Sequence, residues 1–567
     1  MDKQTNKLSR IKHIFFSSLQ AKTILQAILV GLLTGIVVVL FKISISGLFA
    51  FIQNSMSNFD FTQKVIVFPF VTMLGGLISG VLIYKFAPET KGSGIPFVKM
   101  VMTRMGNITR ARSVIVKFLA GVAGIGSGLS LGREGPSVQL GAGCGAFVSK
   151  FFKLKGAMQE KLIASGAGAA IGSTFNAPIA GTLFVFEELT NKFSANLLFT
   201  VLIATVTASG VARHIMGNNP SFDIPQITSS IGFQTIIVCV VLGIVAGVLG
   251  VLFAKVIYFN SNLFDKIKVP FWAKPAIAGF AVGIIGLFVP FVLGSGNLAV
   301  DALLINKFTL LAVIVIFIAK FFITPFCFGS GAAGGIFLPM LMLGAFLGYI
   351  VASLFNLLGF SVDPVIMSMI GMGAFLSAVA RTPITAVVMV FEMTAGYKFI
   401  LPIMLSAAIA DLVAQKLNHK PIYSKLIVNS LEHSEIKYLS DKSVAECMTK
   451  DVLTFSSKTT IDEVIVKTQN LPYNFYPVVD EENYLMGLIS KKDIEDSIFE
   501  KIDKQQEISL IMDTEPIIIN ESENICIAHY RLHTNNAYIL IVIDSHKKVV
   551  GVVTRKDINK VIESEVK

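Results

Sequence analysis

Glu134 is the side chain with the most distinctive chemistry in this sequence. It lies in Gly132-Arg133-Glu134-Gly135-Pro136, inside a long apolar stretch that holds few other acids. A carboxylate at membrane depth is costly and usually marks a path for ions or protons. The glycines beside it let the backbone approach a small ligand closely. The sequence therefore predicts an anion site with a titratable gate. The alternative is that Glu134 only caps a buried helix start.

A second acid, Glu188, lies beside Glu187 at the end of another apolar segment. This part of the chain is duplicated, and Glu187 is matched by Glu392 whereas Glu188 is matched by Met393. We expect the matched glutamates to brace equivalent helix ends, which leaves Glu188 as an additional acid. Two adjacent carboxylates suit a proton relay, because like charges compete for the ionised state. The alternative is a solvated acidic pair at a helix end.

The composition is that of a membrane protein with several spans. The chain has 567 residues, of which 53% are hydrophobic and 15% charged, and its mean hydropathy is +0.70. Soluble domains carry about 25% charged residues. Apolar runs recur from Ile24 to about Leu417, and several are long enough to span a bilayer. Others are interrupted, which predicts discontinuous helices around a central binding site. The interruptions lie near Gly132, Pro178, Gly335 and Pro383.

The charge is divided between two regions of the chain. Residues 1–425 hold 32 basic and 13 acidic side chains, and residues 426–567 hold 16 basic and 24 acidic ones. The basic residues fall between apolar runs, so we expect no nucleic-acid partner. Those before the first run place the N-terminus in the cytoplasm. The five scattered cysteines form no C-x-x-C motif, and no metal site or catalytic residue is predicted.

The apolar region contains an internal repeat. Gly126-Ser127-Gly128 and five later positions recur, with the same spacing and without a gap, from Gly329-Ser330-Gly331 onward. Small-residue spacing in packed helices explains some of the glycines, but it does not explain the matched prolines and glutamates. Two halves facing each other across a central site are therefore expected. The five later pairs are Gly132 and Gly335, Pro136 and Pro339, Gly141 and Gly344, Ala142 and Ala345, and Gly145 and Gly348.

The acidic tail is duplicated as well, since Pro477-Val478-Val479-Asp480 is matched by Ile541-Val542-Ile543-Asp544. Each unit predicts two strands joined by a turn, followed by a helix. The first helix opens at Ser490 and the second at Thr554, and both hydroxyls are natural N-caps. An acid follows in the first turn of each helix, where the helix dipole favours it. These acids are Asp493 and Asp557.

Four motifs in the apolar region resemble the chloride channel (CLC) family of anion channels and proton-coupled antiporters. The resemblance covers about residues 20–426, and the tail resembles a pair of cystathionine β-synthase (CBS) domains. The motifs are Gly92-Ser93-Gly94-Ile95-Pro96, Gly132-Arg133-Glu134-Gly135-Pro136, Gly335-Ile336-Phe337-Leu338-Pro339, and Tyr423 in Pro421-Ile422-Tyr423-Ser424.

This resemblance implies roles for particular residues. The hydroxyls of Ser93 and Tyr423 and the amides of Ile336 and Phe337 would bind the central chloride. Helix N-termini supply the partial positive charge that such a site needs. Glu134 would be the external gate, which plugs the outer site when ionised and leaves when protonated. The backbone around Arg133, Gly135 and Leu338 would support the anion site, with the Arg133 side chain in a structural role.

The resemblance also favours one activity within the family. An acid at Glu188 is similar to the antiporters, in which it passes protons toward the gate, whereas channels usually carry an apolar residue. Ser93 is similar to chloride-preferring members. We therefore expect a chloride/proton antiporter that is not an enzyme. A passive chloride channel is the first alternative, and a membrane-anchored nucleotide sensor without transport is the second.

The expected fold is an all-α polytopic membrane domain of two internal repeats with discontinuous helices, plus an α/β CBS pair. The expected segments are a cytoplasmic segment at 1–22, the membrane domain at 23–426 with halves meeting near 210–235, a linker at 427–440, and CBS domains at 441–501 and 505–567. We expect a homodimer in a bacterial inner membrane, with the CBS domains in the cytoplasm.

The CBS pair is the only predicted cofactor site. By resemblance it would take an adenine nucleotide, ATP or AMP, with Ser490, Asp493, Thr554 and Asp557 as candidate contacts. The alternative is that these are solvated helix-start residues and that the pair only packs or dimerises.

Overall fold

The computed structural model describes two compact units, whose main division falls between Lys425 and Leu426. Most of the expected N-terminal segment 1–22 and much of the expected linker 427–440 lie outside the described residues. The described residues are 19–103, 111–190, 193–218, 220–222, 232–417, 419–432, 442–469, 471–499, 502–534 and 537–566.

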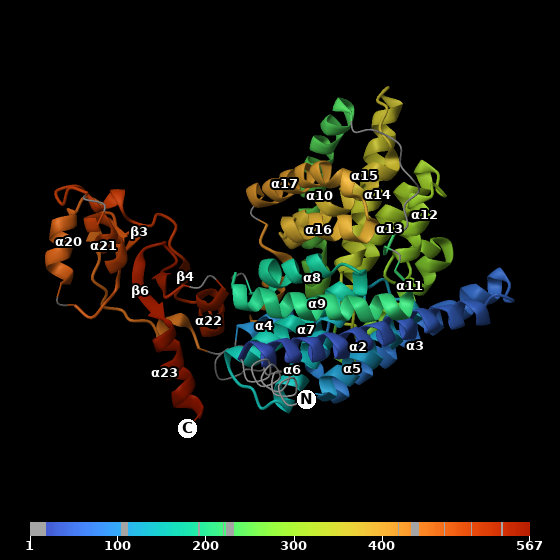
Figure 1. Cartoon of the computed structure of the whole chain (residues 1–567), viewed down its shortest axis with the longest axis horizontal. Coiled ribbons are helices and arrows are strands. Elements are labelled where there is room, and N and C mark those ends of the chain that lie inside the picture. The colour runs from blue at the N-terminus through green and yellow to red at the C-terminus, as the bar shows by residue number, and fades with distance from the viewer. Residues whose placement is uncertain are drawn as a thin grey trace, which may run out of the picture. The chain divides into compact units, whose positions relative to one another are not determined.

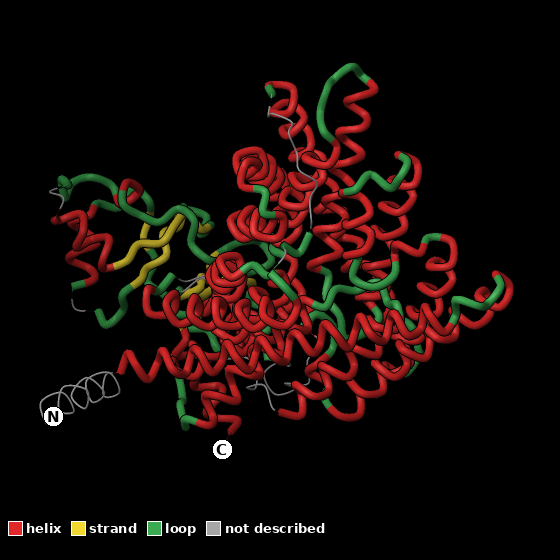
Figure 2. The backbone as a smooth tube through the Cα atoms, turned by 45° about the vertical axis from the view of Figure 1, so that its right-hand side comes forward, coloured by secondary structure: helices red, strands yellow, loops and turns green. Residues whose placement is uncertain are grey.

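The described part of the first unit is built from helices (Figures 1 and 2). Its first series is α2 (Leu19–Ser55), α3 (Phe61–Phe86), α4 (Ile95–Met102), α5 (Ala111–Ser127), α6 (Glu134–Phe151), α7 (Ala157–Phe175), α8 (Pro178–Phe184) and α9 (Ala195–Met216). Its second series is α10 (Phe233–Lys266), α11 (Lys274–Phe288), α12 (Asn297–Leu304), α13 (Leu310–Gly329), α14 (Phe337–Leu357), α15 (Pro364–Ala380), α16 (Pro383–Thr394) and α17 (Ile400–Lys416). Helix α18 (Ile422–Glu432) follows.

The two series correspond helix by helix, as the sequence repeat predicts. Glu134, which begins α6, is equivalent in the repeat to Phe337, which begins α14. In the same way, Pro178 begins α8 and Pro383 begins α16. The predicted interruptions are therefore helix starts. The first series ends at Met216 and the second begins at α10, with residues 223–231 of the join outside the described part.

Within the described residues, eight helices are long and apolar enough to cross a membrane. Their outward faces carry bare apolar side chains, such as Ile66 at 59% and Leu74 at 54% exposure. Exposed apolar surface of this extent is expected where lipid replaces water. The α14 span differs, because 78% of its most apolar window is buried within the protein. The unit is therefore a multi-pass membrane domain with an enclosed centre.

Glycines bring two equivalent helix pairs into close contact. A Cβ at Gly141 of α6 would overlap the carbonyl of Gly166 in α7. In the second half, a Cβ at Gly344 of α14 would overlap the carbonyl of Gly371 in α15. Small-residue packing thus accounts for part of the sequence repeat. It does not account for the glycines at the starts of α6 and α14, which are described below.

The second unit contains two copies of one α/β fold. The first copy comprises β1 (Phe455–Ser456), α20 (Ile461–Thr468), β2 (Phe475–Val479), β3 (Leu485–Ser490) and α21 (Lys491–Phe499). The second comprises β4 (Ile518–Asn520), α22 (Ile525–Thr534), β5 (Ile539–Ile543), β6 (Val549–Thr554) and α23 (Arg555–Val566). The predicted hairpins are β2–β3 and β5–β6. The parallel strands β1 and β4 were not predicted, because they are too short to show a period-two pattern.

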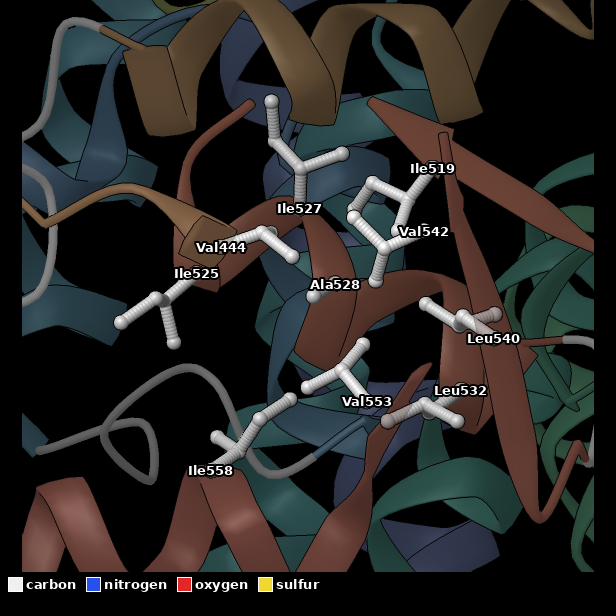
Figure 3. Close-up of a cluster of buried hydrophobic side chains, with 10 residues drawn as sticks. All are labelled: Val444, Ile519, Ile525, Ile527, Ala528, Leu532, Leu540, Val542, Val553 and Ile558. Atoms are coloured by element: carbon white, nitrogen blue, oxygen red, sulfur yellow. The ribbon is translucent and has the colours of Figure 1, made fainter. Parts of the chain in front are cut away.

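The two copies share parts of their sheets. Leu488 in β3 pairs with Asp513, and Val552 in β6 pairs with Thr449, so each copy takes a segment from the other. Leu488 and Val552 are equivalent positions of the tail repeat, and so are Thr449 and Asp513. The second bridge therefore repeats the first with the two copies exchanged, which is what a two-fold arrangement gives. An apolar core fills each copy, and Figure 3 shows that of the second.

Candidate functional site

The starts of α6 and α14 meet at the centre of the membrane domain. Gly132 and Gly335 precede these starts, and each donates its N–H to the carbonyl of the other at 2.6 Å. The bridge is antiparallel, so the two repeats approach in opposite directions. The first N–H groups of a helix have no partner within the helix and carry the positive end of its dipole. Two such ends therefore face one small region.

Glu134 places its carboxylate in this region. The residue is fully buried, and its Oε2 accepts a hydrogen bond of 3.4 Å from the N–H of Leu338, in the first turn of α14. Its Oε1 lies 4.0 Å from Nε of Arg133 and has no hydrogen-bond partner among the described residues. The electrostatic influence of Lys320 and Lys42 also reaches this carboxylate. A carboxylate from one repeat thus lies where the helix start of the other would hold an anion.

Two glycines are required by this geometry. A Cβ at Gly132 would meet Oε2 of Glu134 and, at 3.0 Å, Cδ of Pro339, so a side chain there would displace the carboxylate. A Cβ at Gly135 would overlap the hydroxyl of Ser93 and come within 2.6 Å of the Ser93 carbonyl oxygen. These glycines keep space for the Glu134 carboxylate and for the Ser93 loop.

Ser93 and Tyr423 are buried with unused hydroxyls. Ser93 is 2% exposed and Tyr423 is 0% exposed, and neither side-chain oxygen has a hydrogen-bond partner in the part of the chain that the structure describes. Most buried hydroxyls find a partner, and an unsatisfied one costs about 1–3 kcal/mol. Tyr423 lies within electrostatic range of both Glu134 and Glu188. Two buried O–H donors of this kind are suited to an anion.

The start of α14 is held by aromatic packing. The ring of Phe337 contacts Phe175 at 5.7 Å and Phe184 at 6.2 Å between centroids, from the ends of α7 and α8. Ile336 caps α14 and is fully buried, as is Leu338. The amides that the sequence analysis assigned to chloride therefore belong to a fixed helix start. The site roles themselves stay predictions.

Two lysines at this centre were missed by the sequence analysis. The fully buried Lys117 donates to the carbonyls of Thr90, at 2.8 Å, and Gly92, at 2.5 Å. Lys320 in the second half donates to the carbonyls of Val292, at 2.9 Å, and Gly294, at 2.8 Å. Lys117 thus holds the loop Gly92-Ser93-Gly94, and Lys320 holds the loop Gly294-Ser295-Gly296, which has the same sequence in the second half. The signal in the sequence was that the two lysines occupy equivalent positions of the repeat.

The matched glutamates, Glu187 and Glu392, each cap a helix start in the opposite half of the membrane domain. Glu187 accepts bonds from the N–H groups of Ile384, at 3.1 Å, and Thr385, at 2.7 Å, in the first turn of α16. Glu392 does the same for the first turn of α8, where the N–H groups of residues 179 and 180 donate to it at 3.2 and 2.8 Å. The expectation that Glu187 and Glu392 brace equivalent helix ends is confirmed, with each acid acting on the opposite half.

Glu188 has a different environment from its neighbour. It lies in η2 (Val185–Thr190), a π-helical turn, and is 1% exposed. Its Oε1 is 2.8 Å from Nζ of Lys99, a residue of α4. The alternative of a solvated acidic pair is therefore wrong for Glu188. Lys99 was not singled out in the sequence, because nothing in the chain pattern places α4 against η2.

A cavity of about 690 Å³ is lined in part by Arg133, which precedes Glu134 in the chain. Its lining includes Arg133, Lys42 and Phe175, together with Asn297 and Asp301 of α12. Lys42 and Arg133 bring positive charge to this space, which favours the approach of anions. Arg133 therefore lines the cavity and also lies next to the Glu134 carboxylate.

Comparison with known proteins agrees with this arrangement. Residues 75–415 match the family of voltage gated chloride channels. The H(+)/Cl(-) exchange transporter ClcA of Vibrio parahaemolyticus is 33% identical over 429 residues, which are 73% of this chain and 91% of that protein. The protein belongs to the voltage gated chloride channel family.

Solved structures in this family have the same fold. A slow cyanobacterial Cl-/H+ antiporter superposes with a TM-score of 0.68 and 30% identity, over 73% of this chain and 99% of that one. A eukaryotic CLC transporter superposes with a TM-score of 0.65 over 94% of this chain and 97% of its own, at 19% identity. The second likeness concerns the fold alone.

The tail of this CLC protein is a CBS pair, since residues 444–500 and 507–564 each match the CBS domain. The predicted nucleotide contacts serve their own helix starts. Oδ2 of Asp493 accepts from the hydroxyl of Ser490 at 2.6 Å, and Oδ2 of Asp557 accepts from that of Thr554 at 2.6 Å. The predicted nucleotide role of these four residues stays a prediction.

Proposed function

We propose that this protein exchanges chloride for protons across a membrane. The observation that carries the proposal is the position of Glu134, whose carboxylate accepts a bond from the first turn of α14 while Ser93 and Tyr423 keep hydroxyls without a partner among the described residues. An ionised carboxylate there stands in for an anion. Protonation of Glu134 removes its charge, so the side chain leaves and chloride takes its place. One side chain then links the movement of an anion to that of a proton.

Glu188 supplies the second proton site of this mechanism. It is buried, and Tyr423 lies within electrostatic range of both acids. Protons that reach Glu188 from one side of the membrane would pass to Glu134 on the other side of the anion site. The relatives named above as exchangers support the proposed exchange of chloride for protons.

A passive chloride channel is the second candidate. The ion pair between Lys99 and Glu188 favours it, because a carboxylate held by a buried cation exchanges protons less readily. In that case Glu134 alone would gate the pathway, and chloride would move without protons.

Proton flux in liposomes distinguishes the two candidates. Purified wild type, Glu134→Gln and Glu188→Gln are reconstituted and given a chloride gradient. We expect chloride to drive protons uphill in wild type, and both variants to lose this proton movement while chloride still flows. Chloride flow without proton movement in wild type would establish the channel instead.

The surroundings of the transporter are part of the same proposal. We place it in a bacterial inner membrane as a homodimer with one pathway per subunit and with the CBS pair in the cytoplasm. The CBS pair would bind ATP or AMP and regulate transport. Deletion of residues 430–567 tests this. Regulation requires that the deletion alter the transport rate or remove the response to added nucleotide, and an unchanged rate and response would exclude it.

A further inference from the structure

Lys99 is a charged group that the proposed exchange mechanism does not yet use. Its ammonium lies 2.8 Å from Oε1 of Glu188 and 2.9 Å from Oγ of Ser424. Both partners of the ion pair are almost fully buried, with 3% and 2% of their side chains exposed. Ser424 directly follows Tyr423, so Lys99 connects the internal acid with the segment that carries an anion-site hydroxyl.

Burial gives this ion pair a large effect on proton uptake. Exposed ion pairs contribute little, but loss of one partner from a buried pair leaves an uncompensated charge. A proton that binds Glu188 neutralises the carboxylate and removes the negative charge that faces the Lys99 ammonium at 2.8 Å. Proton uptake by Glu188 therefore has to overcome the attraction between the two groups.

Other charged groups near Glu188 do not replace Lys99 in this role. Burial disfavours the ionised carboxylate most strongly, Lys99 attracts it, and Glu187, on the same turn, repels it. The Glu187 carboxylate is engaged with the first turn of α16, where Thr385 donates two bonds to it. From α18, the Tyr423 hydroxyl is within electrostatic range of Glu188. The attraction from Lys99 thus acts against both burial and the repulsion from Glu187.

We propose that Lys99 is a positioning residue that favours the ionised form of Glu188 against the effect of burial and so sets the pH at which Glu188 accepts a proton. The proton comes from water on the side of Glu188. This inference rests on the proposed exchange function and adds the residue that sets its pH dependence.

The pH dependence of chloride-driven proton flux tests the inference. Wild type, Lys99→Met and Lys99→Arg are compared, with Ser424→Ala as the control that keeps the ion pair. We expect Lys99→Met to move the midpoint of the profile to higher pH by about 1–3 units. Lys99→Arg and Ser424→Ala should stay close to wild type, since both keep a cation beside Glu188.

The outcomes separate this inference from the proposed function. If wild type drives no protons, the exchange function fails. If wild type drives protons and Lys99→Met keeps the wild-type midpoint, only the role of Lys99 is overturned. Should Lys99→Met not fold, the double variant K99M/E188Q removes both charges. Recovery of a folded, chloride-conducting protein would support the pairing, and failure of the double variant as well would overturn it.

Discussion

Lys117 and Lys320 perform the same task in the two halves of the membrane domain. Each ammonium is fully buried and donates to two backbone carbonyls of the segment that contains its own Gly-Ser-Gly loop. The first loop contains Ser93, the predicted chloride ligand, and the second contains Ser295, for which no ligand role is predicted. Lys117 therefore supports the predicted anion site, and Lys320 supports the equivalent loop of the other half, so the two lysines can be compared directly.

Loss of Lys117 should weaken chloride binding more than loss of Lys320. Methionine cannot donate to the carbonyls of Thr90 and Gly92, so the Ser93 loop loses a support that is worth about 1–3 kcal/mol. We expect Lys117→Met to raise the chloride dissociation constant by about tenfold or more, and Lys320→Met to have a smaller effect. Calorimetric titration in detergent measures both. An equal loss of chloride affinity in both variants would mean that the lysine charge matters and that the support of the Ser93 loop does not.

Removal of the Tyr423 hydroxyl should weaken chloride binding without unfolding the protein. A hydrogen bond to a charged group contributes about 1.5–3 kcal/mol, so Tyr423→Phe should raise the chloride dissociation constant by roughly tenfold to a hundredfold. Tyr258→Phe is the matched control. The Tyr258 hydroxyl is also buried without a hydrogen-bond partner among the described residues, but Tyr258 is not a predicted chloride ligand, and its ring lies under the Lys425 ammonium. Unchanged affinity in Tyr423→Phe would remove Tyr423 from the site.

An added methyl group at Gly135 should block the site. The Cβ would meet the Ser93 hydroxyl and backbone, so Gly135→Ala forces the loop to move at a cost of about 1–3 kcal/mol. We expect a large loss of chloride flux per folded protein. Gly210→Ala in α9 is the control, since a Cβ there meets no described atom within 4 Å. Normal flux in Gly135→Ala would show that the close approach of α6 to Ser93 is not needed.

The two adjacent glutamates should separate into a stability role and a transport role. Glu187→Gln weakens the cap on α16 and should lower the free energy of unfolding by about 0.5–2 kcal/mol while proton coupling persists. Glu188→Gln should abolish coupling. Unfolding in detergent and proton flux in liposomes are measured for both variants. Loss of coupling in Glu187→Gln would contradict the assignment. Glu392→Gln, at the equivalent cap on α8, should resemble Glu187→Gln.

Much of the fold follows from local pattern. Glycines, prolines and glutamates that match between the two parts of the apolar region predicted two halves with helices that begin at depth, and the structure has those helix starts. Such signals survive in one sequence because glycine and proline act on the backbone at their own position. The repeat in the tail predicted both hairpins from matched apolar runs that are separated by polar residues. The strands that it missed are too short to show a period.

The contacts that define the site were decided by the tertiary structure. The sequence marked Glu134 and Glu188 as unusual acids, but it did not place the first against Leu338 of the other half or the second against Lys99 of α4. Nor did it show that the matched glutamates cap helices across the repeats, or that two buried lysines fix the Gly-Ser-Gly loops. These partners lie far apart along the chain, and only packing of the helices in three dimensions brings them together. The residue types determined which chemistry is available, and the fold determined which residues come into contact to carry it out.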